Sequence, residues 1–285
     1  MKKDDIQKIV RSTLQEDIGR GDITTNFLIP PHHQSRAVII AKGKAVLCGC
    51  ALVREIFRQL DPALDIVFEH KDGDPVDAKD VLIRLQGRTR AILTGERAAL
   101  NFLSYLSAVA TKTHDFCRAV KPYNVKILDT RKTTPAMRVF ERYAVACGGG
   151  VNHRFNLNEM VLMKDNHRVV CRKHESLLAT VRRLHRKTHK KVQIEVDHLW
   201  ELKEVLEAHP EMVLLDNMSL AELKTAVRLT RKLFPLKKRP LLEASGGVTL
   251  KNVRRIAATG VDRISIGSLT HSRLAVDMSL EITDE

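Results

Sequence analysis

The chain has 285 residues, of which 44% are hydrophobic and 29% are charged. This is the composition of an ordinary globular protein, and it excludes a disordered chain, a collagen-like repeat and a coiled coil. Lys and Arg number 48 against 34 Asp and Glu, so the formal net charge is +14 at pH 7. A surplus of this size favours an anionic partner, such as nucleic acid, acidic lipid or a phosphorylated small molecule.

The cysteine content and the first residues indicate a cytoplasmic protein. The five cysteines are scattered and form no C-x-x-C pair, which argues against a disulfide framework and for a reducing compartment. The start of the chain predicts an amphipathic helix rather than a signal peptide, because Ile6, Val10 and Leu14 share one face. The longest uncharged stretch, residues 98–111, is too short to span a bilayer, so no membrane association is expected.

Up to about residue 112 the pattern mixes helices with alternating strands. Residues 36–47 predict extended segments on either side of Gly43, and residues 81–85 alternate apolar and polar side chains. Residues 51–60 and 95–111 predict helices.

From about residue 125 short apolar strands alternate with helices. Six strands are expected, at residues 126–128, 161–163, 193–196, 213–215, 241–244 and 263–266. Helices are expected between several of them, at residues 176–187, 198–208 and 220–233. This alternation is typical of parallel β/α units, and both an incomplete barrel and a doubly wound sheet fit it. Residues 276–282 return to strict alternation, which predicts a strand that rejoins the first domain's sheet.

Polar residues gather where the predicted parallel strands end. Asp129, Lys164, Asp216 and Ser245 each follow an apolar run directly, and Glu195 lies within one. Parallel α/β folds bind their ligands at the carboxyl ends of the strands, so we expect a site there.

Cations dominate the same region. Arg131 and Lys132 follow one strand, Lys164 ends another, and Arg154 lies in a turn between them. A single cation is usually a solvated surface group, but several near the mouth of a fold without matching acids need an anionic ligand. His153, beside Arg154, is equally consistent with a hydrogen-bonded structural residue and with a functional one.

Glycine-containing turns supply candidate phosphate sites. Ser245-Gly246-Gly247 is expected to open a helix near Thr249, and Gly267-Ser268 follows the next strand. Backbone N–H groups in such turns bind phosphate, and barrel enzymes often hold a phosphate after their last two strands. Residues 148–150 are three consecutive glycines, which permit either close approach of the backbone to a ligand or a flexible connection.

The carboxylates Glu195 and Asp216 have two interpretations. They could bind ribose hydroxyls or share a Mg²⁺ ion that bridges to phosphates, or they could form salt bridges with Lys164 or Arg131. Both hold if the bridges exist only in the empty site. The chain lacks the common phosphate-loop, dinucleotide and hydrolase motifs, and its aromatic content of 4% gives little for stacking on single-stranded nucleic acid.

Specific motifs follow one another along nearly the whole chain. They are EDIGRGDITT (16–25), GERAALNFLS (95–104), DTRKTTP (129–135), GGGVNHR (148–154), KDNH (164–167), IEVD (194–197), LLDNMS (214–219) and EASGGV (243–248). In this order they resemble the quinolinate phosphoribosyltransferase family, also called nicotinate-nucleotide pyrophosphorylase (carboxylating). Small departures, such as Ala98 where the family often has Thr, fall on no presumed ligand position.

The resemblance implies an α/β fold with an N-terminal α/β sandwich domain and an incomplete, seven-stranded α/β barrel, one strand more than the six counted above. We therefore expect the sandwich at residues 1–112, with residues 273–285 returning to it, and the barrel at residues 113–272. The resemblance also implies a homodimer, with the possibility of a higher oligomer, in which Arg97 reaches into the neighbour's barrel.

The activity that the resemblance implies is transfer of the phosphoribosyl group of phosphoribosyl pyrophosphate (PRPP) to quinolinate with decarboxylation. The products are nicotinate mononucleotide, pyrophosphate and CO2, in de novo NAD biosynthesis. By similarity, the expected catalytic residues are Lys132, Lys164, Glu195 and Asp216, the last two also holding Mg²⁺. The other expected substrate-binding residues are Arg97, Thr130, Arg131, His153, Arg154, Ser245, Gly246, Gly247, Ile266, Gly267 and Ser268. Of these, Arg131, His153 and Arg154 would hold the pyridine dicarboxylate together with Lys164, and Lys132 would lie near the phosphates.

Two other functions stay open at this point. A relative of the same fold could act on another acceptor, such as nicotinate or the substrate of the molybdenum-associated homologues. The net charge of +14 motivates a nucleic-acid-binding protein as the more distant alternative. The favoured interpretation expects quinolinate and PRPP as ligands and neither nucleic acid nor membrane as a partner.

Overall fold

The computed structural model describes residues 1–171, 173–235, 238–272 and 276–283. They divide into two compact units. The first unit comprises Met1–His114, Thr134–Gly149 and Leu269–Glu285, and the second comprises Asp115–Thr133 and Gly150–Ser268. Residues 134–149 are in the first unit in this division, whereas the sequence analysis expected them in the second domain.

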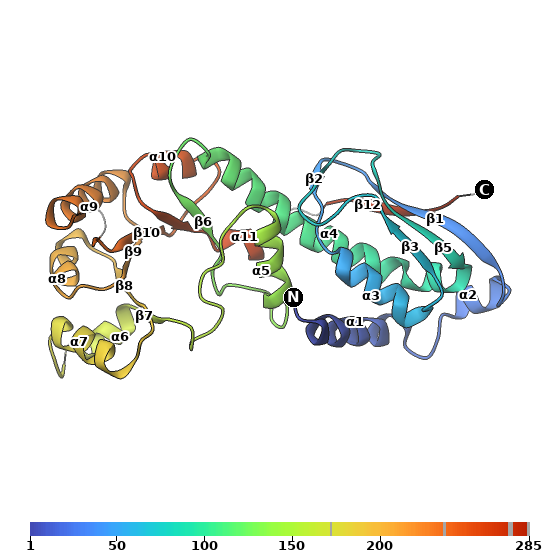
Figure 1. Cartoon of the computed structure of the whole chain (residues 1–285), viewed down its shortest axis with the longest axis horizontal. Helices are drawn as coiled ribbons and strands as arrows, with labels where there is room; N and C mark the ends of the chain where they lie inside the picture. Colours follow the sequence, from blue (N-terminus) through green and yellow to red (C-terminus); the bar gives the residue numbers. More distant parts are fainter. Residues whose placement is uncertain (172, 236–237, 273–275, 284–285) are drawn as a thin grey trace. The chain divides into compact units, whose positions relative to one another are not determined.

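The first unit contains an antiparallel sheet with the strand order β12-β1-β5-β3 (Figure 1). Its strands are β1 (Gln34–Ala41), β3 (Asp65–Phe68), β5 (Val81–Arg88) and β12 (Met278–Thr283), and a separate pair joins β2 (Ala45–Val46) to β4 (Pro75–Val76). β12 runs beside β1 from Arg36 opposite Thr283 to Ala41 opposite Met278. The prediction that the last alternating segment rejoins the first sheet is confirmed, although residues 273–275 and 284–285 lie outside the described residues.

The described part of the first unit contains the helices predicted at the start of the chain and at residues 51–60 and 95–111, together with helices at residues 23–28 and 138–147 that the sequence analysis did not predict. They are α1 (Lys3–Ile18), α2 (Ile23–Leu28), α3 (Cys50–Leu60), α5 (Arg138–Cys147) and α4 (Thr89–Val120), whose last residues belong to the second unit. Helix α3 buries Leu52, Ile56 and Phe57 on one face, which is the spacing of an amphipathic helix. Gly95 of α4 lies against this face, because a Cβ at Gly95 would be 2.6 Å from Phe57 Cε1. The predicted helix at residues 95–111 is confirmed but is longer at both ends.

The second unit is built on a parallel sheet with the strand order β6-β11-β10-β9-β8-β7. Its strands are β6 (Lys126–Leu128), β7 (Val161–Met163), β8 (Val192–Val196), β9 (Met212–Asp216), β10 (Leu241–Ser245) and β11 (Arg263–Ser265). All of the predicted strands are confirmed to within one residue at each end. In the described part of the chain, the seventh strand implied by the resemblance is reduced to one parallel bridge between Val151 and Leu128.

Helices connect the parallel strands. They are α6 (Asp165–Cys171), α7 (Leu177–Lys187), the 3-10 helix η1 (Leu199–Glu201), α8 (Leu202–Glu207), α9 (Leu220–Leu233) and α10 (Val253–Ala257). Helix α11 (Ser268–His271) follows the last parallel strand and belongs to the first unit from Leu269 onward. Helix α9 begins with a capping box, in which Ser219 and Glu222 each bond the other's backbone N–H. Among the described residues, none of the helices combines the length and the apolar character needed to cross a membrane.

The register of the parallel strands arranges side chains in rows. One row across the sheet consists of Glu195, Leu214, Glu243 and Arg263, on β8, β9, β10 and β11. Side chains alternate between the two faces along a strand, so neighbours in a row point to the same face. Asp216 and Ser245 form the next row on that face, nearer the carboxyl ends of the strands. The register therefore determines which polar groups can meet.

Gly148, which follows α5, is required by packing. A Cβ at this position would lie 2.3 Å from the carbonyl oxygen of Ala110 and 2.7 Å from Thr113 Cβ, both on α4. The φ angle of Gly148 is −76°, which other residues also adopt, so the space and not the backbone conformation demands glycine. The first of the three consecutive glycines thus allows a close approach within the first unit, a role that the sequence analysis did not consider.

We predict that Gly148→Ala lowers the free energy of unfolding by about 1–3 kcal/mol, the usual cost of overpacking a filled site. Urea denaturation followed by circular dichroism measures this change. Gly43→Ala is the matched control, because a Cβ at Gly43 would meet no atom within 4 Å. The control should leave stability unchanged or slightly increased. Equal losses in the two variants would contradict the packing role of Gly148.

Candidate anion-binding site

Polar residues from neighbouring strands meet at the carboxyl edge of the parallel sheet. Asp216 ends β9 opposite Ser245 of β10. Lys164, directly after β7, donates from Nζ to Glu195 Oε2 of β8 at 2.6 Å. Glu195 is buried, whereas the side chain of Lys164 is 49% exposed. The structure therefore brings together four of the predicted site residues, and it contains the Lys164–Glu195 salt bridge that the sequence analysis considered.

Arg168 and Glu201 form a buried ion pair, and Arg168 also hydrogen-bonds the backbone of Glu195. Arg168 of α6 donates from Nη1 to the Glu195 carbonyl oxygen at 2.9 Å and from Nη2 to Glu201 Oε1 at 2.5 Å. Burial raises the pKa of Glu201, but the hydrogen bond and charge of Arg168 and two backbone N–H groups outweigh it, so the pKa lies below its ordinary value. The sequence analysis missed both residues, because nothing in the local pattern of α6 marks Arg168 as an interior group.

The loops after β9 and β10 touch each other through a glycine. Gly246 has a φ of +91°, and a Cβ there would lie 2.1 Å from Asn217 Oδ1. Asn217 donates its backbone N–H to the Ser245 carbonyl oxygen at 2.9 Å and its side-chain amide to Asp216 Oδ2 at 2.7 Å. Gly247 differs, because it is exposed and a Cβ there would meet no atom within 4 Å. Gly246 thus serves the contact between the loops, while the space beside Gly247 is open.

The helix after this loop begins later than predicted. It was expected near Thr249, but α10 begins at Val253 and has only five residues. The prediction was wrong because the side chain of Asn252 accepts the Thr249 backbone N–H and donates to the Gly247 carbonyl oxygen, which closes a turn instead.

The turn after β6 presents two cations. Thr130 Oγ1 accepts the backbone N–H of Lys132 at 3.1 Å, and the Thr133 N–H donates to the Arg131 carbonyl oxygen at 3.0 Å. This turn leaves the side chains of Arg131 and Lys132 exposed. After β11, Ile266 is buried and its backbone N–H donates to the Leu128 carbonyl oxygen. Its side chain therefore supports the edge from inside, while Gly267 and Ser268 follow it half-buried.

His153 and Arg154 closely follow Val151, the residue that forms the parallel bridge with Leu128. Arg154 donates from Nη1 to the Met160 carbonyl oxygen at 3.0 Å and lines a cavity of about 380 Å³. Lys191, Met212 and Arg263 also line this cavity. Burial first, and the positive charge of Arg131 second, lower the pKa of Arg154. Arg131 and Arg154 therefore repel each other electrostatically.

A buried carboxylate that the sequence analysis did not assign lies beside His153. Glu243 of β10 is fully buried, and its Oε1 lies 3.2 Å from His153 Nε2. Burial raises the pKa of Glu243, but the contacts with His153 and Arg263 outweigh it, so the pKa lies below its ordinary value. The sequence feature that could have identified Glu243 is its position inside the apolar run 241–244. An unpaired charge there would be costly, so a buried partner could have been expected.

Arg97, the remaining predicted site residue, lies on α4 in the first unit. Its side chain is 66% exposed, and Nη2 is 4.0 Å from Glu96 Oε1. All the other predicted site residues belong to the second unit.

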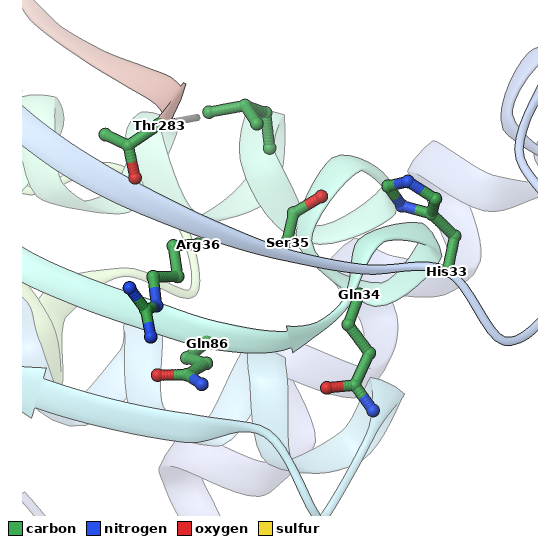
Figure 2. Close-up of a pocket in the computed structure, with 7 residues that line it drawn as sticks. His33, Gln34, Ser35, Arg36, Gln86 and Thr283 are labelled. Carbon is green, nitrogen blue, oxygen red and sulfur yellow. The ribbon is translucent and has the colours of Figure 1, made fainter. Parts of the chain in front are cut away.

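The first unit has a cavity of about 340 Å³ that we do not assign as the site. Its lining residues are His33, Gln34, Ser35, Arg36, Gln86, Ile282 and Thr283. Figure 2 shows Ser35 and Gln34 projecting to opposite sides of β1, as alternation along a strand requires. His33 and Ser35 are also engaged with Thr89 Oγ1, each at 2.7 Å. Polar groups on two faces of a sheet cannot converge on one small ligand.

The described residues contain no group of three His, Cys, Asp or Glu side chains arranged to hold a metal ion.

Comparisons with known proteins cover both units. Residues 22–107 match the family description "Quinolinate phosphoribosyl transferase, N-terminal domain", and residues 109–281 match the corresponding C-terminal domain. The chain is 36% identical over 280 residues to the probable nicotinate-nucleotide pyrophosphorylase (carboxylating) of Bacillus subtilis, covering 98% of this chain and 93% of the relative. The corresponding protein of Methanocaldococcus jannaschii is 38% identical over 286 residues, with 99% of each chain covered.

The solved structures agree with this result. The nicotinate-nucleotide pyrophosphorylase of Francisella tularensis has a TM-score of 0.93 and 36% identity, covering 99% of this chain and 98% of that one.

We predict that Glu201→Gln lowers the free energy of unfolding at pH 7 by about 3 kcal/mol, because it leaves the buried Arg168 without its anionic partner. The pKa of Glu201 is lowered in the folded protein, so its contribution is present above the ordinary pKa of 4.5 and is lost as the pH falls through the folded value. The difference in stability between wild type and variant should therefore narrow below about pH 4.5. Thermal denaturation between pH 3 and 8 measures it, and a constant difference over this range would contradict the assignment.

Proposed function

The chain belongs to the quinolinate phosphoribosyl transferase family, and we propose that it transfers the phosphoribosyl group of PRPP to quinolinate with loss of CO2. The products are nicotinate mononucleotide and pyrophosphate, and we infer a role in de novo NAD biosynthesis in the cytoplasm. The observation that carries the proposal is the meeting of Lys164 with Glu195 and Asp216 at one edge of the sheet. Both proposed substrates are polyanions and one contains a ribose, so they need cations and carboxylates side by side.

We assign the quinolinate carboxylates to Arg131, Arg154 and Lys164. Guanidinium groups match planar carboxylates in geometry, and a lysine supplies a point charge. The lowered pKa of Arg154 indicates that its charge is poorly compensated, which an anion near Arg131 and Arg154 would correct. Half of the Lys164 side chain is exposed, so Nζ can turn from Glu195 towards a substrate carboxylate.

We assign the 5-phosphate of PRPP to the turns after β10 and β11. The residues are Ser245, Gly246, Gly247, Gly267 and Ser268, with Thr130 and the backbone of Ile266 beside them. Gly247 supports this assignment, because the space around it is open to a ligand. Lys132, exposed in the turn after β6, is assigned to the pyrophosphate.

Glu195 and Asp216 fit the ribose hydroxyls and a Mg²⁺ ion. They point to the same face of the sheet from adjacent strands, and Mg²⁺ in proteins is commonly held by one or two carboxylates plus substrate phosphates. When bound, Mg²⁺ would neutralise the charge that develops on the departing pyrophosphate.

The protein's residues contribute mainly orientation and charge. The quinolinate nitrogen displaces pyrophosphate at the anomeric carbon, and positive charge builds on the ribose as the bond breaks. Glu195 and Asp216 stabilise that charge, while Lys132 stabilises the leaving group. When the 2-carboxylate leaves as CO2, the electron pair of the broken carbon–carbon bond stays on ring carbon 2, where the adjacent positively charged nitrogen stabilises it, and that carbon then takes up a proton. The residues that hold two polyanions together thus overcome their mutual repulsion.

We also propose that the active form is a homodimer in which Arg97 completes the site of the partner. The support is that the Arg97 side chain is exposed and that its contact with Glu96 is loose, with 4.0 Å between Nη2 and Oε1. An arginine of this kind is suited to a dianionic substrate.

With PRPP and Mg²⁺, the protein should convert quinolinate to nicotinate mononucleotide and release label from the 2-carboxylate as CO2. Nicotinate should react at least about a hundredfold more slowly, because it leaves a cation of the site unpaired. Chromatography of the products and counting of released CO2 measure both rates, and EDTA should abolish them. A protein that converts nicotinate but does not convert quinolinate would contradict the proposed acceptor. A protein that binds duplex DNA and is not displaced from it by PRPP would favour the nucleic-acid alternative.

Arg97→Ala and Lys164→Ala should each abolish activity without unfolding the protein. If the site is shared, unfolding and refolding the two variants together should restore about a quarter of the wild-type activity, because half of the dimers are mixed and each has one intact site. Steady-state rates of the mixture measure the recovery, and each variant refolded alone is the control. A mixture that stays inactive would contradict a shared site.

A further inference from the structure

Arg168 is a buried arginine that reaches the turn after β8 through two of its nitrogens. Its side chain is 3% exposed. Nη1 donates to the Glu195 carbonyl oxygen at 2.9 Å, and Nη2 donates to Glu201 Oε1 at 2.5 Å. Glu201 Oε2 in turn accepts the backbone N–H groups of Asp197 and His198, each at 3.3 Å. One ion pair is therefore connected to the backbone at and after the carboxyl end of β8.

The Glu195 carbonyl group faces the side of β8 on which β7 has already ended. Val161 of β7 donates its backbone N–H to the Lys191 carbonyl oxygen at 3.0 Å. Donors and acceptors in a parallel ladder advance two residues at a time, so Asp165 would be the donor to Glu195 if β7 continued. Helix α6 begins at Asp165 instead. Arg168 Nη1 thus takes the place of the missing strand donor to a buried carbonyl group.

The residues that begin α6 hold Glu195 at two places that differ in freedom. Lys164, directly before α6, donates to the carboxylate at 2.6 Å, and Arg168, one helical turn later, donates to the carbonyl oxygen. The Lys164 side chain is 49% exposed and can exchange its partner, whereas Arg168 is enclosed by protein. The contact with the carboxylate can therefore be given up to a substrate while the contact with the backbone persists.

We propose that Arg168 is a positioning residue for the ribose-binding carboxylate, because it holds the backbone of Glu195 beyond the end of β7. The Glu195 side chain then stays directed to the same face as Asp216 when Lys164 leaves it. This inference rests on the proposed function for the role of Glu195 and Asp216. It assigns Arg168 no contact with a substrate, only an action through Glu195.

Arg168→Met tests the proposal with an unbranched side chain that makes neither hydrogen bond. β8 still pairs with β9 as far as Val196, opposite Leu215, so only the end that faces β7 should loosen. We expect kcat/KM for PRPP, at saturating quinolinate, to fall about 10- to 100-fold, because a displacement of about 1 Å can cost about a hundredfold in rate. Steady-state rates with radiolabelled PRPP measure this change.

A double-mutant cycle with Glu195→Ala separates positioning from a general loss of structure. If Arg168 acts through Glu195, adding Arg168→Met to Glu195→Ala should change kcat/KM for PRPP less than about twofold. A residue that only stabilises the fold would give the same fold-loss in both backgrounds. Equal losses in the two backgrounds would therefore overturn the proposal.

Glu211→Ala is the matched control at the other end of the same strand. Glu211 Oε2 accepts the backbone N–H of Val192, the first residue of β8, at 2.7 Å. The control should lower the melting temperature and leave kcat/KM for PRPP within about twofold of the wild-type value. A loss in Glu211→Ala as large as that in Arg168→Met would count against the positioning role.

Crystal structures of the wild type and of Arg168→Met provide a measurement that needs no activity. The proposal expects the backbone of Glu195 to move in the variant while Asp216 stays in place. An unmoved Glu195 would overturn the inference. A wild type that does not convert quinolinate would instead contradict the proposed function, and a displaced Glu195 would still show that Arg168 holds it.

The double variant that combines Arg168→Met with Glu201→Gln is the second test should Arg168→Met not fold. It removes the donor to the Glu195 carbonyl group without leaving a buried charge, and replacing both members of a buried ion pair by uncharged groups is often tolerated. A glutamine keeps one oxygen that can accept backbone N–H groups. The same loss in kcat/KM for PRPP is expected, and a folded double variant with the wild-type value would overturn the proposal.

Discussion

The parallel register of the second unit is the constraint on which the candidate site depends. Because neighbours in a parallel ladder point to the same face, one row brings Glu195 level with Glu243, and the next brings Asp216 level with Ser245. A shift of one residue in any strand would turn its polar group to the other face, towards the helices. The apolar residues between them, such as Leu214, fill the same face and keep the register in place. The positions of the charged groups are thus a consequence of burying the strands.

Much of this arrangement could be predicted from the sequence. Short apolar runs located the parallel strands to within one residue, because a strand covered on both faces has few polar positions. The polar residue that ends each run then identified the edge of the sheet, since all parallel strands end on the same side. The Lys164–Glu195 salt bridge could be considered from the sequence for the same reason. Individual roles for His153 and Arg97 came from the family resemblance, because neither side chain has a local pattern that indicates its use.

What could not be predicted depends on contacts between distant parts of the chain. Gly148 was interpreted through its glycine neighbours, whereas its environment is set by Ala110 on α4. Gly246 was assigned to a phosphate, and the structure adds the contact with Asn217 from the preceding loop. Glu243 was part of a quoted motif, but its partners come from three other segments. In each case the residue type was visible in the sequence, while the atoms that make it necessary lie tens of residues away.

The ion pair at the edge of the sheet has a consequence for the order of events in the proposed reaction. Lys164 neutralises Glu195 in the structure, so Glu195 is not available to a ribose while this bridge persists. A quinolinate carboxylate that attracts Lys164 would release Glu195 beside Asp216, at the place assigned to the sugar. Exchange of one anionic partner for another costs less than exposing an uncompensated charge, because Lys164 remains paired throughout. In the proposed reaction, Glu195 would therefore become available to the ribose only when the acceptor is in place, and this would limit loss of pyrophosphate in the absence of the acceptor.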